Sequence, residues 1–352
     1  MRCAPVARTC GWRICITFRS ISLFDIYRAV GINSAAFCFA IDVRSLGLYH
    51  VMSAAIIGAL SNIEEVIMNY TSEEANILVQ ALPYIQKYYG KIIVIKYGGN
   101  AMIDEDLKRS VIRDVVLMHY VGMKPILVHG GGPEISAVMK KLGKEPEFIN
   151  GRRVTDAETM EIVEMVLAGK TNKGIVSIIN NLGGKGVGLS GKDANLIVAE
   201  KAEGEVDLGF VGQVAKINPA ILVDLLEHGY IPVVSSVAIG PNGESFNVNA
   251  DHIAGEIAAE VSATKLMMMT DVPGIYSDFS DKSTFISELS IDDAKKMIET
   301  KQIDKGMIPK VEACMTALDG AVERTHIIDG TMPHSLLMEI FTDTGIGTMI
   351  VP

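Results

Sequence analysis

A lysine and two glycines follow a run of β-branched residues in the stretch VIKYGGNAM, residues 94–102. A strand that ends near Lys96 and turns at Gly98 and Gly99 places a cation beside open backbone, which suits a phosphate group. The P-loop has its lysine after the glycines and follows it with Ser or Thr, and this chain contains no such pattern. The stretch therefore predicts a phosphate site that is not a P-loop.

A second glycine turn lies in LVHGGGPEIS, residues 127–136, where three glycines end another apolar run. Pro133 opens a helical pattern, so the N–H groups of Gly131 and Gly132 would lie at the positive end of a helix with no Cβ in the way of an anion. One such turn alone can be a tight loop without a ligand, but two turns after two adjacent strands favour a binding site. We expect His129 to be a structural hydrogen-bonding residue rather than a catalyst.

An arginine pair precedes a helical pattern in NGRRVTD, residues 150–156. The planar guanidinium of Arg152 or Arg153 can hold a carboxylate through two parallel hydrogen bonds. A solvent-exposed pair without a ligand is the alternative interpretation. The motif alone does not decide between the two.

Polar residues alternate in FNVNAD, residues 246–251. In an extended chain, Asn247, Asn249 and Asp251 would share one face, where they could contact one ligand. Asp251 also precedes an apolar helical pattern, and an aspartate at that place commonly caps the helix N-terminus. The pattern leaves both interpretations open.

Lys310 lies in KGMIPKVEA, residues 305–313, at the start of a helical pattern. A cation there is unfavourable beside the positive end of the helix dipole unless an anion accompanies it. No Ser–His–Asp or Cys–His arrangement and no metal-ligand spacing stands out in the chain. Lysines, an arginine and glycine amides without a base suit transfer of a phosphoryl group to an acceptor that is already ionised, such as a carboxylate with a pKa near ~4.3.

The segment Gly186–Gly191 matches G-x-G-x-x-G, the dinucleotide-binding pattern. That pattern must end a strand and begin a helix, whereas the KDANLIVAEK that follows here predicts a turn and a strand. We therefore assign no nicotinamide site to it. Met267–Met269 predicts a buried strand rather than a ligand surface.

The body of the chain alternates predicted strands and helices, which indicates an α/β fold with a largely parallel sheet. In such sheets ligands bind beyond the carboxyl ends of the strands, where both glycine turns fall. The predicted strands lie in KIIVIKYGG, PILVHGGG, YIPVVSS and KLMMMTD. The predicted helices span residues 105–120, 133–142, 157–182, 250–262 and 291–300.

The chain has 352 residues, a formal net charge of −10 and 49% hydrophobic residues, the composition of an ordinary globular protein. The acidic charge argues against nucleic acid as the main partner, whereas a locally positive site for an anionic small molecule is compatible with it. Only Cys314 lies outside the first fifty residues among five cysteines. A disulfide framework would spread cysteines through the fold, so we expect a reducing, cytoplasmic location.

The first fifty residues differ from the rest, with six Arg, two Asp and no Lys. We interpret residues 1–67 as a leader without a folding role, with an organellar transit peptide as the alternative. The uncharged run from Ser45 to Ile63 is diluted by polar residues and predicts no membrane span. Residues 68–90 predict a helix, kinked at Pro83, that packs either on its own domain or on another subunit.

The chain resembles the acetylglutamate kinases of the amino-acid kinase family in six motifs that occur in this order: IVIKYGGNAM, LVHGGGPEIS, NGRRVTD, FNVNADHIA, MTDVPGIY and GMIPKVEA. The resemblance runs from about residue 71 to the end. It implies a three-layer αβα sandwich, with residues 91–235 mainly binding N-acetyl-L-glutamate and residues 236–352 mainly binding ATP. The implied reaction moves the γ-phosphate onto the side-chain carboxylate of N-acetyl-L-glutamate, the second step of arginine synthesis.

The resemblance also implies residue roles. Two lysines would neutralise the phosphoryl group from the acceptor and nucleotide sides, and an aspartate would orient both. Mg²⁺ would be held mainly by the ATP phosphates, with no metal-binding residue in the protein. The implied residues are Lys96, Lys310 and Asp251 as the catalytic set, Gly131, Gly132, Arg153 and Asn247 as the substrate-binding set, and Gly98 and Gly99 as the phosphate loop.

The ending HIIDGTMPHSLLMEIFTDTGIGTMI and the helix at residues 71–89 resemble the arginine-inhibited branch of the family. In that branch the N-terminal helix joins dimers into a ring-shaped hexamer, which favours the subunit-contact interpretation of this helix. The resemblance places His326, Glu339 and Gly345 where the branch binds arginine, and Tyr84 on the linking helix. About 60 upstream residues have no counterpart in the family.

Two other functions stay open. Acetylaminoadipate kinases use an acceptor that is one methylene longer, and one methylene is worth only about 1–3 kcal/mol of discrimination. A catalytically inactive, arginine-sensing scaffold would need none of Lys96, Asp251 and Lys310, so the presence of all three favours an enzyme.

Overall fold

The central sheet of the computed structural model is mainly parallel, as the alternation of strands and helices predicts. The structure describes residues 75–304 and 306–352. From β15 to β5 all neighbouring strands run parallel, while β16 is antiparallel to β15 and parallel to β14. The spatial order is β14 (Glu288–Ser290), β16 (Thr348–Val351), β15 (Arg324–Asp329), β11 (Lys265–Thr270), β1 (Ile92–Tyr97), β2 (Lys124–His129), β8 (Ile231–Ser235) and β5 (Gly186–Leu189).

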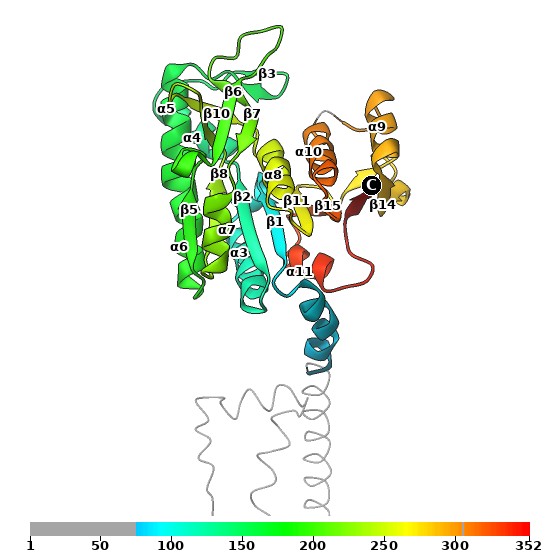
Figure 1. Ribbon diagram of the computed structural model, residues 1–352. Coiled ribbons are helices and arrows are strands. Elements are labelled where there is room, and N and C mark those ends of the chain that lie inside the picture. The colour runs from blue at the N-terminus through cyan, green and yellow to red at the C-terminus, as the bar shows by residue number, and fades with distance from the viewer. Residues whose placement is uncertain (1–74, 305) are drawn as a thin grey trace, which may run out of the picture. The chain divides into compact units, whose positions relative to one another are not determined.

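Helices cover both faces of this sheet (Figure 1). Side chains alternate along β1, so that Ile93 and Ile95 pack on one face and Val94 packs on the other. On the face of Ile93 lie α3 (Glu105–Tyr120), α6 (Asn172–Asn181) and α11 (Ser335–Ile340). On the opposite face lie α7 (Ala220–Glu227), α8 (Ala250–Glu260), α9 (Ile291–Glu299) and α10 (Ile308–Asp319). The predicted three-layer αβα sandwich is confirmed.

Smaller strands surround the end of the sheet that carries the glycine turns. A closed four-stranded sheet consists of β10 (Ser245–Val248), β7 (Val211–Ile217), β6 (Ile197–Lys201) and β9 (Val237–Ile239). Short hairpins consist of β3 (Phe148–Ile149) with β4 (Arg152–Arg153), and of β12 (Ile275–Tyr276) with β13 (Phe285–Ile286). The 3-10 segments are η1 (Gly99–Met102), η3 (Asp193–Asn195) and η4 (Lys282–Thr284).

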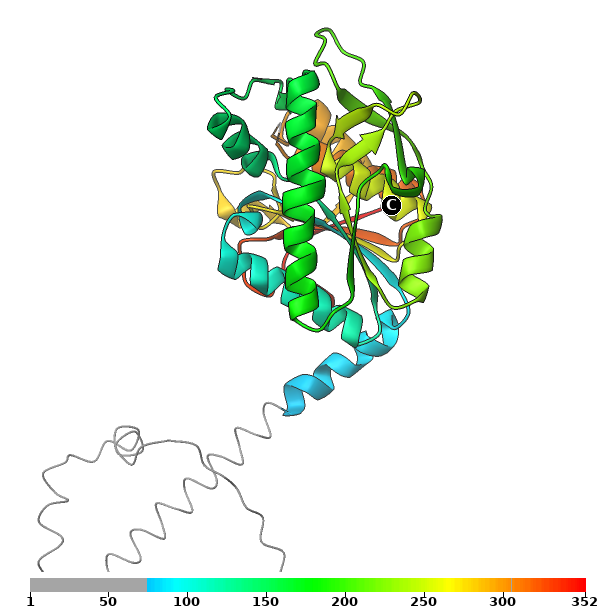
Figure 2. The ribbon, with the colours of Figure 1, turned by 90° about the vertical axis from the view of Figure 1, so that its left-hand side faces the viewer.

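The helix predicted over residues 157–182 contains a π-helical segment that the apolar periodicity does not reveal. It consists of α5 (Ala157–Glu164), the π segment Met165–Thr171 and α6, which Figure 2 shows as one long green helix. A π turn adds a residue to the helix and rotates the side chains that follow it. Here it brings Asn172 onto the buried face above β2 and β8.

Other predictions from the sequence agree closely with the structure. Helix α3 has the predicted bounds, and α4 (Gly132–Lys141) begins one residue earlier than predicted, at Gly132. The segment Gly186–Gly191, to which no nicotinamide site was assigned, contains β5 and is followed by the three-residue 3-10 segment η3 and by β6, so no α-helix follows its glycines. Met267–Met269 are buried in β11.

The described part of the N-terminal helix spans residues 75–88 and passes through Pro83 without a break. Tyr88 is buried in the core of the α3 face. Residues 76–352 form one compact unit, so the helix belongs to the body of the protein. The predicted leader, residues 1–67, lies outside the described residues, as does the predicted start of the helix at residues 68–74. No helix within the described residues is long and apolar enough to cross a bilayer.

Candidate active site

Loops at the carboxyl ends of β1, β2 and β8 enclose a cavity of ≈ 380 Å³, which we call the acceptor cavity. Both predicted glycine turns contribute to it, because β1 and β2 are adjacent parallel strands and end at the same edge. The closed four-stranded sheet and the β3–β4 hairpin complete its wall. The predicted residues that line it are Lys96, Gly98, Gly99, Gly131, Gly132, Arg153 and Asn247.

Lys96, Asp251 and Lys310 form a buried charge network beside this cavity. The Lys96 Nζ lies 2.8 Å from the Asp251 Oδ1, and the Lys310 Nζ lies 3.1 Å from the Asp251 Oδ2. Burial by itself raises the pKa of Asp251, but the two ammonium groups outweigh it and hold that pKa at about 2. Asp251 is therefore ionised at neutral pH and bridges two cations.

The packing of α8 against α10 determines where Lys310 lies. Gly255 in α8 faces Ala313 in α10 so closely that a Cβ at Gly255 would be 2.6 Å from the Ala313 carbonyl oxygen. This close contact brings the first turns of both helices together, and each first turn carries one member of the Asp251–Lys310 pair. The unfavourable position of Lys310 at a helix N-terminus is thus compensated by the anion that the sequence required.

The segment FNVNAD is not extended as a whole, so its three polar side chains do not share one strand face. Asn247 lies on β10, Asn249 caps α8 by accepting a hydrogen bond from the Asp251 N–H, and Asp251 is already inside the helix. The interpretation of Asp251 as the N-cap is wrong, because Asn249 has that position. This frees the Asp251 carboxylate for the two lysines.

Gly98 lies directly against the Lys96 side chain. A Cβ at Gly98 would lie 2.7 Å from the Lys96 Nζ, so any other residue would displace the ammonium group. Gly99 has a φ of +71°, a left-handed conformation that favours glycine, and a Cβ there would collide with the Asp271 carboxylate. Gly98 therefore leaves room for the Lys96 ammonium group, and Gly99 allows the left-handed turn beside Asp271.

Arg153 is the buried member of the arginine pair, and Arg152 is exposed. The Arg153 Nη2 donates to the Ser136 Oγ at 2.8 Å and to the Gly132 carbonyl oxygen at 2.9 Å. Its guanidinium carbon lies 4.6 Å from the ring centroid of Phe148, which stacks over it. These contacts hold the guanidinium at the cavity wall, where it can bind a carboxylate.

Asn247 and Arg153 are connected through Thr155. The Asn247 Nδ2 donates to the Thr155 Oγ1 at 3.3 Å, and the Thr155 hydroxyl donates to the Arg153 carbonyl oxygen at 2.8 Å. Both side chains that the sequence proposed for one ligand are thus linked, although they come from different sheets.

Sequence reasoning missed several lining residues of the acceptor cavity. Ser236 is the last residue of the predicted segment YIPVVSS and directly follows β8, so its place at a strand end was a usable signal. The others carry no local signal, because they reach the cavity only through the fold. The missed polar and aromatic residues are Phe148, Gln213, Ser236 and His252.

A family model described as the amino acid kinase family matches residues 91–329. The chain belongs to the amino acid kinase family. The acetylglutamate kinase of Pelotomaculum thermopropionicum is 57% identical to it over 288 residues, covering 79% of this chain and 98% of that protein. The acetylglutamate kinase of Moorella thermoacetica is 54% identical over 289 residues, covering 80% and 98%.

Solved structures share this amino acid kinase fold at lower identity. N-acetylglutamate synthase from Neisseria gonorrhoeae, in complex with coenzyme A and N-acetyl-glutamate, superposes with a TM-score of 0.70 at 24% identity. The match covers 79% of this chain and 63% of that one. Carbamate kinase from Giardia lamblia, bound to citric acid, gives a TM-score of 0.54 at 16% identity, covering 74% and 98%.

A second cavity in this amino acid kinase, of ≈ 270 Å³, lies between the N-terminal helix and the C-terminal segment, and we call it the effector cavity. The structure brings together around it the three residues that the resemblance proposed for an effector, His326, Glu339 and Gly345. Tyr84, which the resemblance placed on the linking helix, also lines it. The Tyr84 hydroxyl donates to the Asp343 Oδ1 at 2.6 Å, which ties the N-terminal helix to the cavity wall. The cavity is also lined by three basic side chains, those of Lys87, Lys265 and Arg324.

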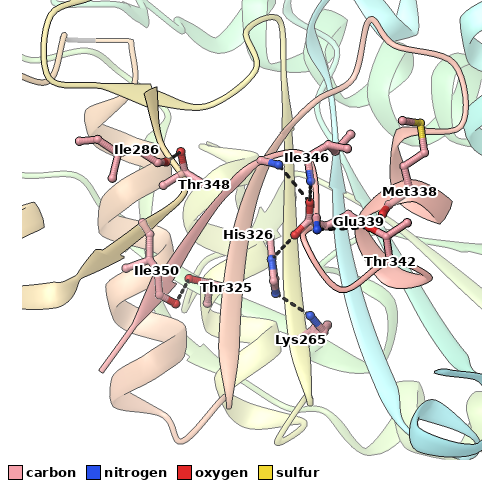
Figure 3. A network of polar contacts seen from close by, with 12 residues as sticks. Lys265, Ile286, Thr325, His326, Met338, Glu339, Thr342, Ile346, Thr348 and Ile350 are labelled. Carbon is pink, nitrogen blue, oxygen red and sulfur yellow. Dashed lines mark hydrogen bonds and ion pairs between the residues drawn. The ribbon is translucent and has the colours of Figure 1, made fainter. Parts of the chain in front are cut away.

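His326 lies between Lys265 and Glu339 at the base of this cavity (Figure 3). The His326 Nε2 lies 2.7 Å from the Lys265 Nζ, and its Nδ1 lies 2.6 Å from the Glu339 Oε1. Burial lowers the pKa of Lys265 to about 8 and also lowers that of His326. Burial alone would raise the pKa of Glu339, but the His326 hydrogen bond and backbone N–H groups lower it, so Glu339 is an anion at neutral pH.

Proposed function

We propose that this chain transfers the γ-phosphate of ATP to the side-chain carboxylate of N-acetyl-L-glutamate, the second step of arginine synthesis. The observation that carries the proposal is the Lys96–Asp251–Lys310 network beside a cavity that also holds Arg153 and Asn247. The high identity to acetylglutamate kinases over nearly their whole length supports the choice of acceptor.

On the acceptor side, we propose that Arg153 binds the α-carboxylate and Asn247 the α-amido region. The remaining side-chain carboxylate would then extend toward the two glycine turns. It needs no base, because a carboxyl group with a pKa near ~4.3 is ionised at neutral pH. It attacks the γ-phosphorus, the bond to the bridging oxygen of ADP breaks, and an acyl phosphate and ADP result.

On the phosphoryl side, the barrier is the repulsion between an anionic acceptor and an anionic phosphate. Lys96 reduces this repulsion on the acceptor side and Lys310 on the nucleotide side, while the Gly131 and Gly132 N–H groups bind equatorial oxygens. Asp251 accepts from both lysines and keeps them on either side of the reacting group. In these roles residues 91–235 mainly serve the acceptor and residues 236–352 mainly the nucleotide.

We propose that Mg²⁺ enters with ATP and is held mainly by phosphate oxygens and water, as this ion prefers. The donor set at the transfer point fits this arrangement, since the Asp251 carboxylate is already paired with two lysines. When bound, the ion offsets negative charge on the phosphates.

The decisive experiment traps the acyl phosphate with hydroxylamine after incubation with ATP and an acetylated amino acid. We expect hydroxamate from N-acetyl-L-glutamate, with a kcat/KM at least tenfold higher than from N-acetyl-L-α-aminoadipate. A preference for the longer acid would assign the chain to the aminoadipate reaction instead. No hydroxamate from either acid would leave the non-catalytic scaffold as the explanation.

We further propose that arginine inhibits the enzyme by binding in the effector cavity. An anion at Glu339 and cations at Lys87 and Arg324 suit a ligand that carries both a guanidinium and a carboxylate. The contact between Tyr84 and Asp343 supports a coupling of this cavity to the N-terminal helix.

We propose that the N-terminal helix joins dimers of this cytoplasmic enzyme into a hexamer. The helix exposes several large apolar side chains close together, which is unusual unless a partner covers them. These side chains are Ile77, Leu78, Val79 and Leu82, followed by Tyr89. Light scattering after size exclusion tests this: we expect a hexamer, and Leu78→Glu together with Leu82→Glu should leave a smaller species.

A further inference from the structure

His129 lies directly before the second glycine turn and is buried. Its Nδ1 lies 2.8 Å from the carbonyl oxygen of Gly130, and its Nε2 lies 3.1 Å from the amide nitrogen of Asn172. Burial lowers the pKa of His129 to about 4, so the ring is neutral at physiological pH. A neutral imidazole has one donor nitrogen and one acceptor nitrogen, and its neighbours decide which is which.

The contacts of Asn172 with the sheet determine which ring nitrogen of His129 is the acceptor. Its Nδ2 lies 2.8 Å from the Val233 carbonyl oxygen on β8 and 3.3 Å from the Leu189 carbonyl oxygen on β5. Carbonyl oxygens only accept, so this end of the Asn172 side chain must be the NH₂ group. The Lys173 Nζ donates to the Asn172 Oδ1 at 3.2 Å, which agrees with the same orientation.

An NH₂ group facing the His129 Nε2 requires that nitrogen to be the acceptor. The proton of the neutral ring is then on Nδ1, and it is donated to the Gly130 carbonyl oxygen. The opposite tautomer would direct two donors at each other across 3.1 Å and leave two acceptors facing each other at Gly130.

The Gly130 carbonyl and the Gly131 N–H belong to one planar peptide unit and point in opposite directions. Fixing the carbonyl toward His129 therefore fixes the N–H on the other side, where Gly131 lines the acceptor cavity. Within the described part of the chain, no backbone carbonyl accepts from the Gly131 N–H. The Gly130 N–H is also held, because it donates to the Tyr97 carbonyl oxygen at 3.3 Å.

We propose that His129 is a positioning residue whose Nδ1–H holds the Gly130 carbonyl and so directs the Gly131 N–H at the transferring phosphoryl group. The proposal rests on the kinase function given above. Asn172 selects the tautomer, and the π-helical segment Met165–Thr171 places Asn172 over the sheet. π turns within long helices frequently occur at functional sites, which agrees with this assignment.

The tautomer itself is measured by long-range ¹H–¹⁵N correlation on protein labelled with ¹⁵N-histidine. The His129 signals are those that disappear in His129→Asn. We expect an Nδ1–H tautomer at pH 7 that persists to pH 5. An Nε2–H tautomer, or a ring protonated at pH 6, would overturn the proposal. This measurement needs no substrate, so its result is independent of whether the chain is a kinase.

Two matched variants test the consequence for catalysis. The amide introduced in His129→Asn can place its NH₂ where Nδ1 was, whereas the amide in His129→Gln reaches the Nε2 position and offers no donor to Gly130. We expect kcat to fall about 10–100-fold in His129→Gln and clearly less in His129→Asn, with both KM values within about threefold of wild type. Equal losses in both variants, or losses confined to KM, would show a merely structural role and overturn the proposal. Circular dichroism confirms folding, and the tautomer measurement on the wild type remains decisive if the Gln variant does not fold.

Discussion

The Lys96 ammonium and the Asp251 carboxylate lie 2.8 Å apart, and both side chains are almost completely buried. Strand β1 supplies the first and helix α8 the second, so the pair exists only when the sheet and its covering helix are assembled. Removing two charges from water is costly, and an apolar pair of the same size often stabilises a protein as well or better. A buried ion pair at the edge of a polar cavity therefore points to function rather than to stability.

Asp251→Asn should abolish most activity and also destabilise the fold. The variant leaves Lys96 and Lys310 buried without a counter-charge, and breaking a buried pair costs about 3–5 kcal/mol. Urea unfolding measures the stability change, and hydroxamate formation measures turnover. Lys144 provides a comparison, since its ion pair with Glu158 is more exposed and Glu158→Gln should cost less than about 1 kcal/mol. Similar stability losses in the two variants would contradict the special position of Asp251.

Gly98→Ala should reduce turnover with little change in stability. A methyl group at this position would lie 2.7 Å from the Lys96 Nζ, and the flexible side chain would move away from the transfer point. A displacement of about 1 Å at a reacting group can cost about 100-fold in rate. Gly204→Ala is the matched control, because a Cβ there meets only the Val206 carbonyl oxygen at 3.8 Å. Wild-type turnover in Gly98→Ala would mean that Lys96 does not act where we place it.

Arg153→Lys should raise the KM for N-acetyl-L-glutamate and leave the KM for ATP unchanged. A lysine ammonium cannot make the two parallel hydrogen bonds of the guanidinium fork. Hydrogen bonds to charged groups contribute about 1.5–3 kcal/mol, so the KM should rise roughly 10–150-fold. Arg152→Lys, at the exposed neighbour, should change the KM much less. Initial-rate kinetics with each substrate varied in turn distinguishes the two, and equal effects would remove the assignment to Arg153.

Glu339→Gln should make the enzyme much less sensitive to arginine without slowing the uninhibited reaction. The neutral amide removes the anion at the base of the effector cavity, and the loss of a charged hydrogen bond should raise the half-inhibitory arginine concentration roughly 10–150-fold. Glu288→Gln is the control, since Glu288 lines the same cavity but is exposed. If wild type shows no inhibition at saturating arginine, the proposed regulation is excluded.

Below pH 6.5 the free energy of unfolding of the wild type should contain a decrease that comes from His129. A variant without His129 should lack this contribution. The folded pKa of His129 is about 4, below the 6.5 of the unfolded chain, so unfolding takes up a proton between these values. The contribution of His129 to the free energy of unfolding is fully present above pH 6.5. It decreases toward pH 4, by about 3 kcal/mol in total. Asp114 has the opposite effect on the pH dependence of stability. Burial raises its pKa to about 6, so its contribution to the free energy of unfolding increases as the pH falls.

The contribution of Asp114 cancels when wild type is compared with His129→Asn at each pH. Urea unfolding at pH 7 and pH 4 should therefore show the stability advantage of wild type over the variant shrinking by about 3 kcal/mol. A constant difference would mean that His129 titrates normally and is not held neutral by its surroundings.

The sequence alone predicted the layers of the fold and the two glycine turns. Helix α3 and strands β1, β2, β8 and β11 follow from apolar periodicity, which reflects interactions between residues close in the chain. Gly98 and Gly131 were recognisable because a glycine after a strand is itself a local signal. The π segment Met165–Thr171 was not predicted, because an extra residue within a helix hardly changes the apolar pattern around it.

The sequence by itself determined which residue types were available: lysines and an arginine for anions, and glycines that leave backbone N–H groups open. Only the tertiary structure decided their partners. It made Asn249 rather than Asp251 the cap of α8, which the local pattern had left open. It also buried Arg153 rather than Arg152 and paired Asp251 with two lysines, which the motifs alone left undecided and only the family resemblance implied. The physical reason is that burial and charge pairing depend on contacts between distant segments, here the edge shared by β1 and β2 and the close packing of α8 on α10. Such contacts between distant segments cannot be recognised from patterns in the local sequence.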